Sequence, residues 1–235
     1  MSDAPAALRA ALLALVGVCY HTCVTPPNRA PSASERAKAQ PADPLGFRII
    51  RRSQVFNQTV LWTFILSDTA AHFPTHPLSA RLLPLLPLPV SQFQPGPARI
   101  TAPLALGITL VLAGTALRTA SYRALGRLFT FELALRDAHA LVTRGPYALV
   151  RHPGYLGAVL AHTGMLLVGA AVGAPWLRTV GGRAAGAVVL GGVGWVMAGF
   201  VKRVRIEDAL MRGAFGGEWE EWARRVRWRI VPGVF

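Results

Sequence analysis

Charged side chains are scarce in this chain. Asp, Glu, Lys and Arg make up 15% of its 235 residues, whereas a soluble globular domain has about 25%. Apolar residues account for 52% of the sequence, and the mean hydropathy is +0.39. This composition predicts a membrane protein. The length allows one domain with four to six membrane spans and leaves no room for a separate soluble catalytic domain.

Acidic residues are scarcer than basic residues. The chain has 11 Asp and Glu against 25 Lys and Arg, which gives a net charge of +14. A strongly basic chain can indicate a nucleic-acid partner. Here the arginines fall between apolar runs and no aromatic-basic RNA motif accompanies them, so we predict no nucleic-acid partner. The positive charge favours orientation in a membrane of anionic lipids.

Cysteine is also rare. Cys19 and Cys23 lie four residues apart in the first apolar run, with His21 between them. Two cysteines exclude a disulfide framework, and a structural metal site needs four ligands, which are not found nearby. We interpret both as small core residues and predict no metal.

A glycine-rich phosphate-binding turn is missing as well. No Gly-x-Gly-x-x-Gly segment follows a predicted strand. The nearest pattern, at residues 191–194, lies inside an apolar run and indicates helix packing. The sequence therefore gives no sign of a soluble nucleotide-binding fold.

Long apolar runs are what the chain has in abundance. They predict an all-α fold, a polytopic integral membrane helical bundle with about five to six transmembrane helices. The predicted spans are residues 4–24, 55–73, 100–119, 154–174 and 183–201. Residues 77–90 are apolar but contain four prolines, so we expect a re-entrant or surface segment there.

Several features of these spans have more than one interpretation. Residues 1–24 are a retained span or a cleaved signal peptide, and the sequence around Cys19 is a poor cleavage site, which favours the span. Asp68 is either a functional acidic residue within a span or part of a wet helix end. Gly169 and Gly173 form a small-xxx-small step that permits close helix approach.

Basic residues predict the orientation of the bundle. Residues 25–54, residues 120–153 and the tail from Lys202 are all rich in Lys and Arg. The predicted spans put these three segments on one side, which should be cytosolic. We divide the chain into residues 1–99, with N-terminal spans and a basic linker, and residues 100–235, a membrane-embedded core with a cytosolic loop and C-terminal tail.

The loop at residues 141–157 is the densest group of polar and irregular residues. Its Gly-Pro and His-Pro steps block a regular helix, and irregular backbone at a membrane edge needs a reason. Tyr147, His152 and Tyr155 suit a polar ligand held at the membrane face. The alternative is a basic loop whose prolines only end helices, with His152 capping the start of the next one.

The tail begins with a basic helix. Arg203 and Glu207 are four residues apart and therefore lie on one helical face. By themselves they indicate a surface salt bridge on an amphipathic interfacial helix.

Four motifs in order change this interpretation. They are Leu141-Val-Thr-x-Gly-x-Tyr, Arg151-His-Pro-x-Tyr-x-Gly, Arg203-x-x-x-Glu-Asp, and Phe215-Gly-x-Glu-Trp-x-x-Trp followed by Arg225-Val and Pro232. With these motifs the chain resembles the isoprenylcysteine carboxyl methyltransferase family of integral membrane enzymes, over roughly residues 100 to 234. Phospholipid N-methyltransferases and sterol reductases share a similar C-terminal pattern.

The resemblance implies methyl transfer from S-adenosylmethionine to the α-carboxylate of a C-terminal prenylated cysteine. It implies prenylated CaaX-type proteins and membrane lipids as partners, and a multi-pass place in the endoplasmic reticulum membrane with a C-terminal active site facing the cytosol. Arg203 would orient the substrate carboxylate and Glu207 would act beside it. The cofactor pocket would be lined by Glu132, His139, Ala140, Leu141, Val142, Tyr147, His152, Pro153, Gly154, Tyr155 and Glu207.

Three positions depart from the family pattern. Glu132 stands where the family often has glutamine, and Trp219 and Trp222 stand where tyrosines are common. Two other functions stay open on sequence alone. One is a phospholipid or other lipid methyltransferase on the same scaffold, and the other is a non-catalytic membrane scaffold or transporter with a basic cytosolic face.

Overall fold

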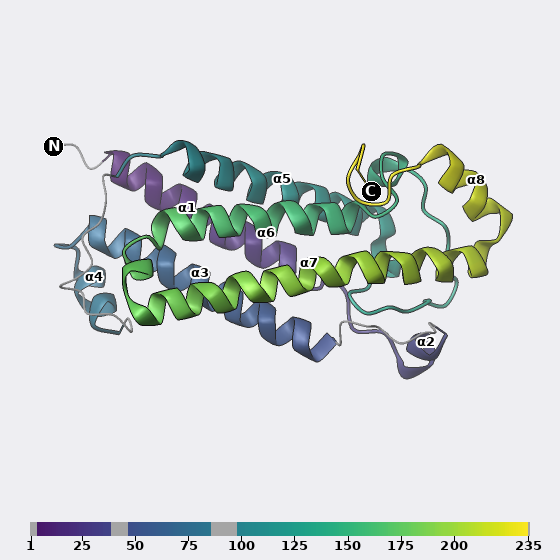
Figure 1. The fold of residues 1–235 in the computed structure, drawn as a ribbon, viewed down its shortest axis with the longest axis horizontal. Coiled ribbons are helices and arrows are strands. Elements are labelled where there is room, and N and C mark those ends of the chain that lie inside the picture. The colour runs from purple at the N-terminus through teal and green to yellow at the C-terminus, as the bar shows by residue number, and fades with distance from the viewer. Residues whose placement is uncertain (1–3, 39–46, 86–97, 235) are drawn as a thin grey trace. The chain divides into compact units, whose positions relative to one another are not determined.

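The computed structural model describes residues 4–38, 47–85 and 98–234. Every regular element in these ranges is helical (Figure 1), so the all-α prediction is confirmed. The α-helices are α1 (Ala4–Val24), α2 (Ala33–Ala37), α3 (Phe47–His72), α4 (Pro77–Leu82), α5 (Ala102–Leu125), α6 (Pro153–Val172), α7 (Val180–Phe215) and α8 (Gly217–Arg225). Short 3-10 helices are η1 (Leu83–Leu85), η3 (Gly126–Leu128), η4 (Gly145–Ala148) and η5 (Trp176–Arg178).

Four of the described helices are long and apolar enough to cross a membrane. They are α1, α5 with η3, α6 and α7. α3 has 26 residues, which is long enough to span, but its arginines and amides make it less apolar than the other four. A membrane helical bundle is confirmed, whereas the count of five to six spans stays a prediction.

The helix predicted at residues 55–73 starts earlier in the structure. α3 begins at Phe47, eight residues before the predicted start at residue 55. The stretch 47–54 has no proline or glycine, so nothing local stops the helix from starting inside the basic linker. The proline-rich segment 77–90 begins as the short helices α4 and η1, in line with the prediction that it forms no straight span. Its residues 86–90 lie outside the described ranges, so a re-entrant or surface placement stays a prediction.

The chain forms two compact units. Unit 1 consists of Met1–Thr22, Ser53–Ala113 and Leu160–Val193, and unit 2 consists of Cys23–Arg52, Gly114–Val159 and Gly194–Phe235. Unit 2 therefore gathers the three basic segments that the sequence predicts to be neighbours.

Unit 1 contains a buried ion pair between α1 and α3. The Asp68 carboxylate accepts hydrogen bonds from Arg9 Nε at 2.8 Å and from Arg9 Nη2 at 2.9 Å. His72 Nδ1 lies 3.7 Å from the same carboxylate. Asp68 is thus a paired core residue and not the wet helix end that the sequence left open.

A second polar group lies deeper in unit 1. Gln54 Nε2 is 3.2 Å from His162 Nε2, and the ring of Tyr20 meets the His162 ring edge-on at 5.5 Å. All three side chains are buried. Polar side chains among apolar helices pair with one another because lipid and core offer them no water.

Glycines let α5 and α6 approach closely. In unit 1, a Cβ added to Gly164 would lie 2.6 Å from the carbonyl oxygen of Gly107 and 2.7 Å from the Val111 nitrogen. In unit 2, a Cβ on Gly157 would lie 2.7 Å from the Gly114 oxygen. Gly173 likewise leaves room for Phe64 of α3, at 2.7 Å from such a Cβ. These contacts are the close helix approach that small residues permit.

Gly164→Ala is expected to destabilise the protein by about 1–3 kcal/mol, because the added methyl group would overlap backbone atoms that cannot move aside alone. The measurement is the Tm of the detergent-purified protein. Gly191→Ala is the matched control, since a Cβ there meets nothing within 4 Å and alanine is the better helix former. Equal Tm values for the two variants would contradict the prediction.

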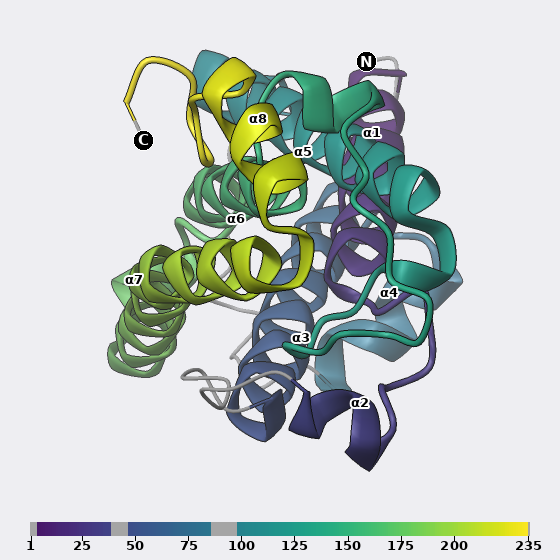
Figure 2. The same ribbon diagram turned by 90° about the vertical axis from the view of Figure 1, so that its right-hand side faces the viewer.

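In unit 2, α7 continues without a break into the tail and then turns sharply into α8. Gly216 makes this turn with φ of +52°, a left-handed conformation that glycine adopts without strain. Trp219 and Trp222 of α8 are buried against Tyr147 and Val226. Figure 2 shows α8 at the end of α7 and the loop after α5, in teal, running on toward α2.

Candidate functional site

The predicted ligand loop is held by the C-terminal tail. The backbone nitrogens of Arg151 and His152 donate to the carbonyl oxygens of Trp228 and Arg229, at 2.9 and 2.8 Å. The His152 carbonyl accepts from the nitrogens of Tyr155 and Leu156, so the residue does begin α6. Its side chain has a separate partner on α7.

Asp208 is the centre of a buried charge cluster. Its Oδ1 accepts a hydrogen bond from His152 Nε2 at 2.9 Å. Its Oδ2 accepts from Arg151 Nη1 at 3.0 Å and from Arg229 Nε at 2.9 Å. One carboxylate therefore joins the loop, α7 and the tail. Burial lowers the pKa of Arg151, and the Asp208 charge opposes that effect.

Glu207 faces the same loop from the neighbouring position on α7. Its Oε2 accepts a hydrogen bond from the Tyr155 hydroxyl at 2.8 Å, and its Oε1 lies 3.9 Å from His152 Nδ1. The Tyr155 ring packs edge-on against Phe200 at 4.9 Å. About a third of the Glu207 side chain stays exposed (35%), so this carboxylate is reachable by a ligand and Asp208 is not.

Arg203 lies one turn before Glu207 on α7 and is buried. Its Nη2 donates to the carbonyl oxygen of Phe131, and its guanidinium carbon is 6.0 Å from the centre of the Tyr155 ring. The helical face predicted from the spacing therefore points inward at the loop. It does not lie on an exposed interfacial helix.

Residues 139–142, which have no regular secondary structure, follow Arg136 in unit 2. His139 has a buried Nδ1 that finds no hydrogen-bond partner among the described residues, and its ring is 6.1 Å from that of Phe215. Burial lowers the pKa of His139, so the imidazole is neutral at pH 7. Within the described ranges the backbone nitrogens of residues 140–142 are not used in hydrogen bonds.

Tyr147 has a packing role in the described structure. Its side chain is buried against Trp219, Trp222 and Val226, and Leu141 and Val142 pack on the same cluster. The Tyr147 carbonyl accepts from Trp222 Nε1 at 3.2 Å, and burial raises the pKa of its phenol. The two tryptophans that depart from the family pattern thus form an apolar cluster on which the loop packs.

Pro153 and Gly154 occupy the first turn of α6. The Gly154 carbonyl accepts from Arg118 Nη1 at 2.6 Å, while Arg118 Nε donates to the Cys23 carbonyl at 2.6 Å and its guanidinium stacks over Phe131 at 4.8 Å. Arg118 therefore joins the end of α1, the loop and α6.

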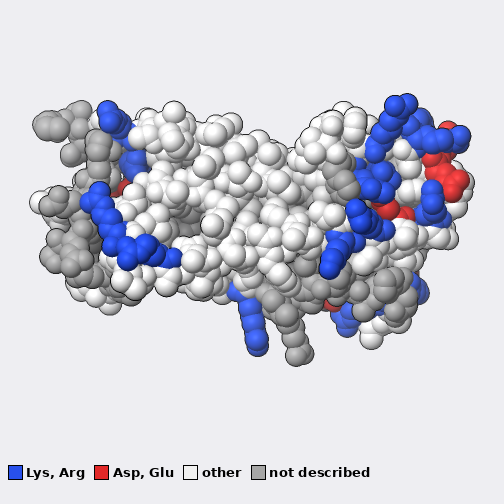
Figure 3. Space-filling view, in the orientation of Figure 1, with Lys and Arg blue, Asp and Glu red and all other residues white. Residues whose placement is uncertain are grey.

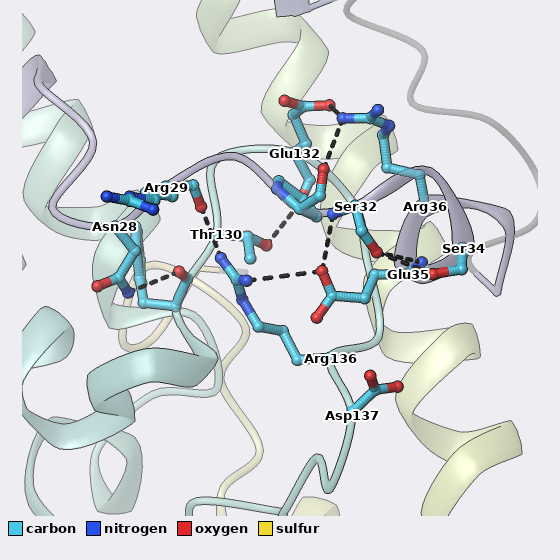
Figure 4. A network of polar contacts seen from close by, with 12 residues as sticks. Asn28, Arg29, Ser32, Ser34, Glu35, Arg36, Thr130, Glu132, Arg136 and Asp137 are labelled. Atoms are coloured by element: carbon cyan, nitrogen blue, oxygen red, sulfur yellow. Dashed lines mark hydrogen bonds and ion pairs between the residues drawn. The ribbon is translucent and has the colours of Figure 1, made fainter.

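Glu132 lies apart from this group in the described contacts. Its Oε2 is 3.3 Å from Arg36 Nη1, and its carbonyl accepts from the Thr130 hydroxyl (Figure 4). No contact joins it to Glu207 in the described part of the chain, so its place in a cofactor pocket stays a prediction.

Sequence reasoning missed two residues that the structure makes central. Asp208 appears in the third motif but received no role, because the sequence does not say which of two adjacent carboxylates faces the loop. Arg118 received none either, although a charged residue inside an apolar run is a candidate functional residue. That rule was applied to Asp68 and would have found Arg118 too.

Comparison with known proteins finds a family match over part of the chain. Residues 106–180 match the model of the Isoprenylcysteine carboxyl methyltransferase (ICMT) family. This segment is similar to the ICMT family. The match contains the Gly-Pro-Tyr and Arg-His-Pro loop and the first half of the α6–α7 hairpin, so the resemblance to the family is confirmed.

Curated relatives extend the likeness over about half of the chain. A probable protein-S-isoprenylcysteine O-methyltransferase of Oryza sativa subsp. indica is 34% identical over 123 residues, 52% of this chain and 57% of the rice protein. Protein-S-isoprenylcysteine O-methyltransferase B of Arabidopsis thaliana is 30% identical over 122 residues, 51% of this chain and 55% of the plant protein. The chain thus covers a little more than half the length of the ICMT relatives that it matches.

Proposed function

We propose that the protein transfers a methyl group from S-adenosylmethionine to the α-carboxylate of a C-terminal prenylated cysteine on CaaX-type proteins. The observation that carries the proposal is that the loop at residues 141–157, which lies in the segment matched by the ICMT family model, contacts α7. Tyr155 and His152 of the matched segment contact Glu207, and Arg203 stands one turn away. The names of the relatives support the acceptor.

The residues present suit S-adenosylmethionine. This cofactor carries a positive sulfonium, an adenine and an amino-acid end. Glu207 offers a partly exposed carboxylate, His139 offers a buried nitrogen that needs a partner, and residues 140–142 offer backbone amides. Pro153 and Gly154 would border the pocket beside Tyr155, and Tyr147 would support it from below.

The chemistry needs orientation more than proton transfer. Bound S-adenosylmethionine supplies an electrophilic methyl on a sulfonium. The substrate carboxylate is ionised at neutral pH, so one of its oxygens forms the new bond to carbon while the carbon–sulfur bond breaks and its electron pair stays on sulfur. The methyl ester and a neutral thioether are the products.

Arg203 would hold that carboxylate. A guanidinium binds a carboxylate in a fork and never deprotonates. Phe131 holds Arg203 by its carbonyl and Tyr155 flanks it, so the side chain is already oriented before substrate arrives. Preorganised alignment of this kind contributes several kcal/mol to a displacement reaction.

The lipid part of the substrate would lie among the apolar helices. α6 and the adjoining stretch of α7 present an uncharged surface in Figure 3, and charged side chains gather over α8. Glu218, Glu220, Glu221, Arg224 and Arg225 supply the charges of α8. The resemblance to the family supports a place in the endoplasmic reticulum membrane as part of this proposal. The basic segments of unit 2 would face the cytosol.

The direct test is transfer of labelled methyl from S-adenosylmethionine to N-acetyl-S-farnesyl-cysteine by the detergent-purified protein. We expect label on this acceptor and none on the same lipid with its carboxylate amidated. Cofactor binding without label on either acceptor, together with label on a phospholipid, would point to a lipid methyltransferase. Absence of cofactor binding would leave a non-catalytic membrane protein.

A further inference from the structure

The segment after α1 lies against the loop after α5 in unit 2 (Figure 4). Asn28 Nδ2 donates to the carbonyl oxygens of Gly126 and Phe129, at 2.8 and 3.0 Å. Arg36 and Lys38 pair with Glu132 and Asp137 about 100 residues further along the chain. We name residues 28–38 the strap.

Arg136 of the loop makes two contacts with the strap. Its Nη2 donates to the Arg29 carbonyl at 2.7 Å, and its Nη1 lies 3.6 Å from Glu35 Oε2. The two side chains are only 18% and 12% exposed. A pair this well covered is screened less by salt than a surface pair, which contributes little.

Glu35 is held in place before it meets Arg136. Its Oε2 accepts from the Ser32 nitrogen at 2.8 Å, and its own nitrogen donates to the Ser32 hydroxyl at 3.2 Å. This is a capping box at the start of α2. The Ser32 amide is the main reason that the pKa of Glu35 is lowered, so the carboxylate is charged at pH 7.

The strap contacts the loop at Arg136 and Asp137, just before residues 139–142, which we propose to bind the cofactor. The His139 nitrogen donates to the Arg136 carbonyl at 3.1 Å, which closes a turn. Ala138 within that turn has φ of +54°, a strained conformation for a residue with a Cβ. Strain of this kind persists only where the surroundings hold it, and the ion pairs at Arg136 and Asp137 are the contacts placed to do so.

We propose that the strap positions residues 139–142 for cofactor binding, with Arg136 and Glu35 as its positioning residues. The expected effect on KM rests on the proposed function, whereas the expected effect on the structure of the loop does not. The ion pairs hold the loop, the turn at Ala138 sets the direction of the chain, and Leu141 and Val142 then pack on the cluster of Tyr147, Trp219 and Trp222. Neither Arg136 nor Glu35 contacts substrate.

The test is a double-mutant cycle with Arg136→Ala and Glu35→Gln. The glutamine keeps an acceptor for the capping box and removes the charge. Each single variant should raise KM for S-adenosylmethionine about threefold to tenfold with little change in kcat. The double variant should add little to Arg136→Ala, since that variant already removes the pair with Glu35 together with the hydrogen bond to the Arg29 carbonyl. Arg136→Lys should restore part of the loss. Arg123→Glu, an exposed arginine of α5 with no ion pair among the described residues, is the matched control.

Amide hydrogen exchange gives a readout that needs no activity. Arg136→Ala should speed exchange of the His139 amide, whose hydrogen bond to the Arg136 carbonyl closes the turn, and leave α6 and α7 protected, whereas Arg123→Glu should change neither. Unchanged exchange at His139, or faster exchange throughout the protein, would contradict the positioning role of the strap. If the wild type neither binds cofactor nor transfers label, the proposed function fails, and the exchange result still decides the strap.

Discussion

Arg203→Ala is expected to lower kcat/KM for methyl transfer by roughly 30- to 4,000-fold. This range corresponds to the about 2–5 kcal/mol lost when one partner of a buried, hydrogen-bonded charge pair is truncated. Arg203 is buried and its guanidinium donates to the Phe131 carbonyl, so the variant would leave the substrate carboxylate without this oriented partner. The measurement is the steady-state rate with the farnesyl-cysteine acceptor.

Arg203→Ala should impair use of the farnesyl-cysteine acceptor and should not weaken cofactor binding. Binding of S-adenosylmethionine should stay within about threefold of the wild type, because the proposed cofactor contacts of Arg203's neighbours remain. Arg205→Ala is the matched control, since Arg205 is exposed two residues further along α7. Arg203→Lys should stay impaired, because a point charge cannot bind a carboxylate in a fork. Loss of cofactor binding in Arg203→Ala would assign the residue to the cofactor instead.

Asp208→Ala is expected to destabilise the protein by about 3–5 kcal/mol. The variant removes the carboxylate that pairs with both Arg151 and Arg229, and it removes the hydrogen bond of His152 Nε2 as well. Breaking a buried charge pair leaves the remaining charge uncompensated, which costs this much. The measurement is Tm in one detergent, with denaturation followed by loss of helical signal.

Glu221→Ala is the control for Asp208→Ala. Its pair with Arg225 is exposed on α8, with two-thirds of each side chain accessible, so the change should cost less than about 0.5 kcal/mol. Asp208→Asn should fall between the two, since an amide keeps an acceptor and loses the charge. A Tm for Asp208→Ala equal to that of Glu221→Ala would show that the three partners find other compensation.

The sequence by itself determined the parts of this protein that local pattern controls. Apolar runs of sufficient length predicted α1, α5, α6 and α7 to within a few residues, except that α7 runs on past residue 201 into the tail. The spacing of Arg203 and Glu207 predicted one helical face. The motif order predicted the ICMT resemblance, which the family match confirms.

Only the tertiary structure decided how these parts meet. Glu207 and Asp208 are adjacent, and which of them is buried depends on the rotation of α7, which its packing partners set. Glu132 aligned with a cofactor residue yet pairs with Arg36, a contact 96 residues apart in the chain. Arg118, Arg136 and the close-approach glycines likewise act through distant partners. Periodicity carries information over a few turns of helix, whereas ion pairs and close packing between distant segments arise only when the chain has folded.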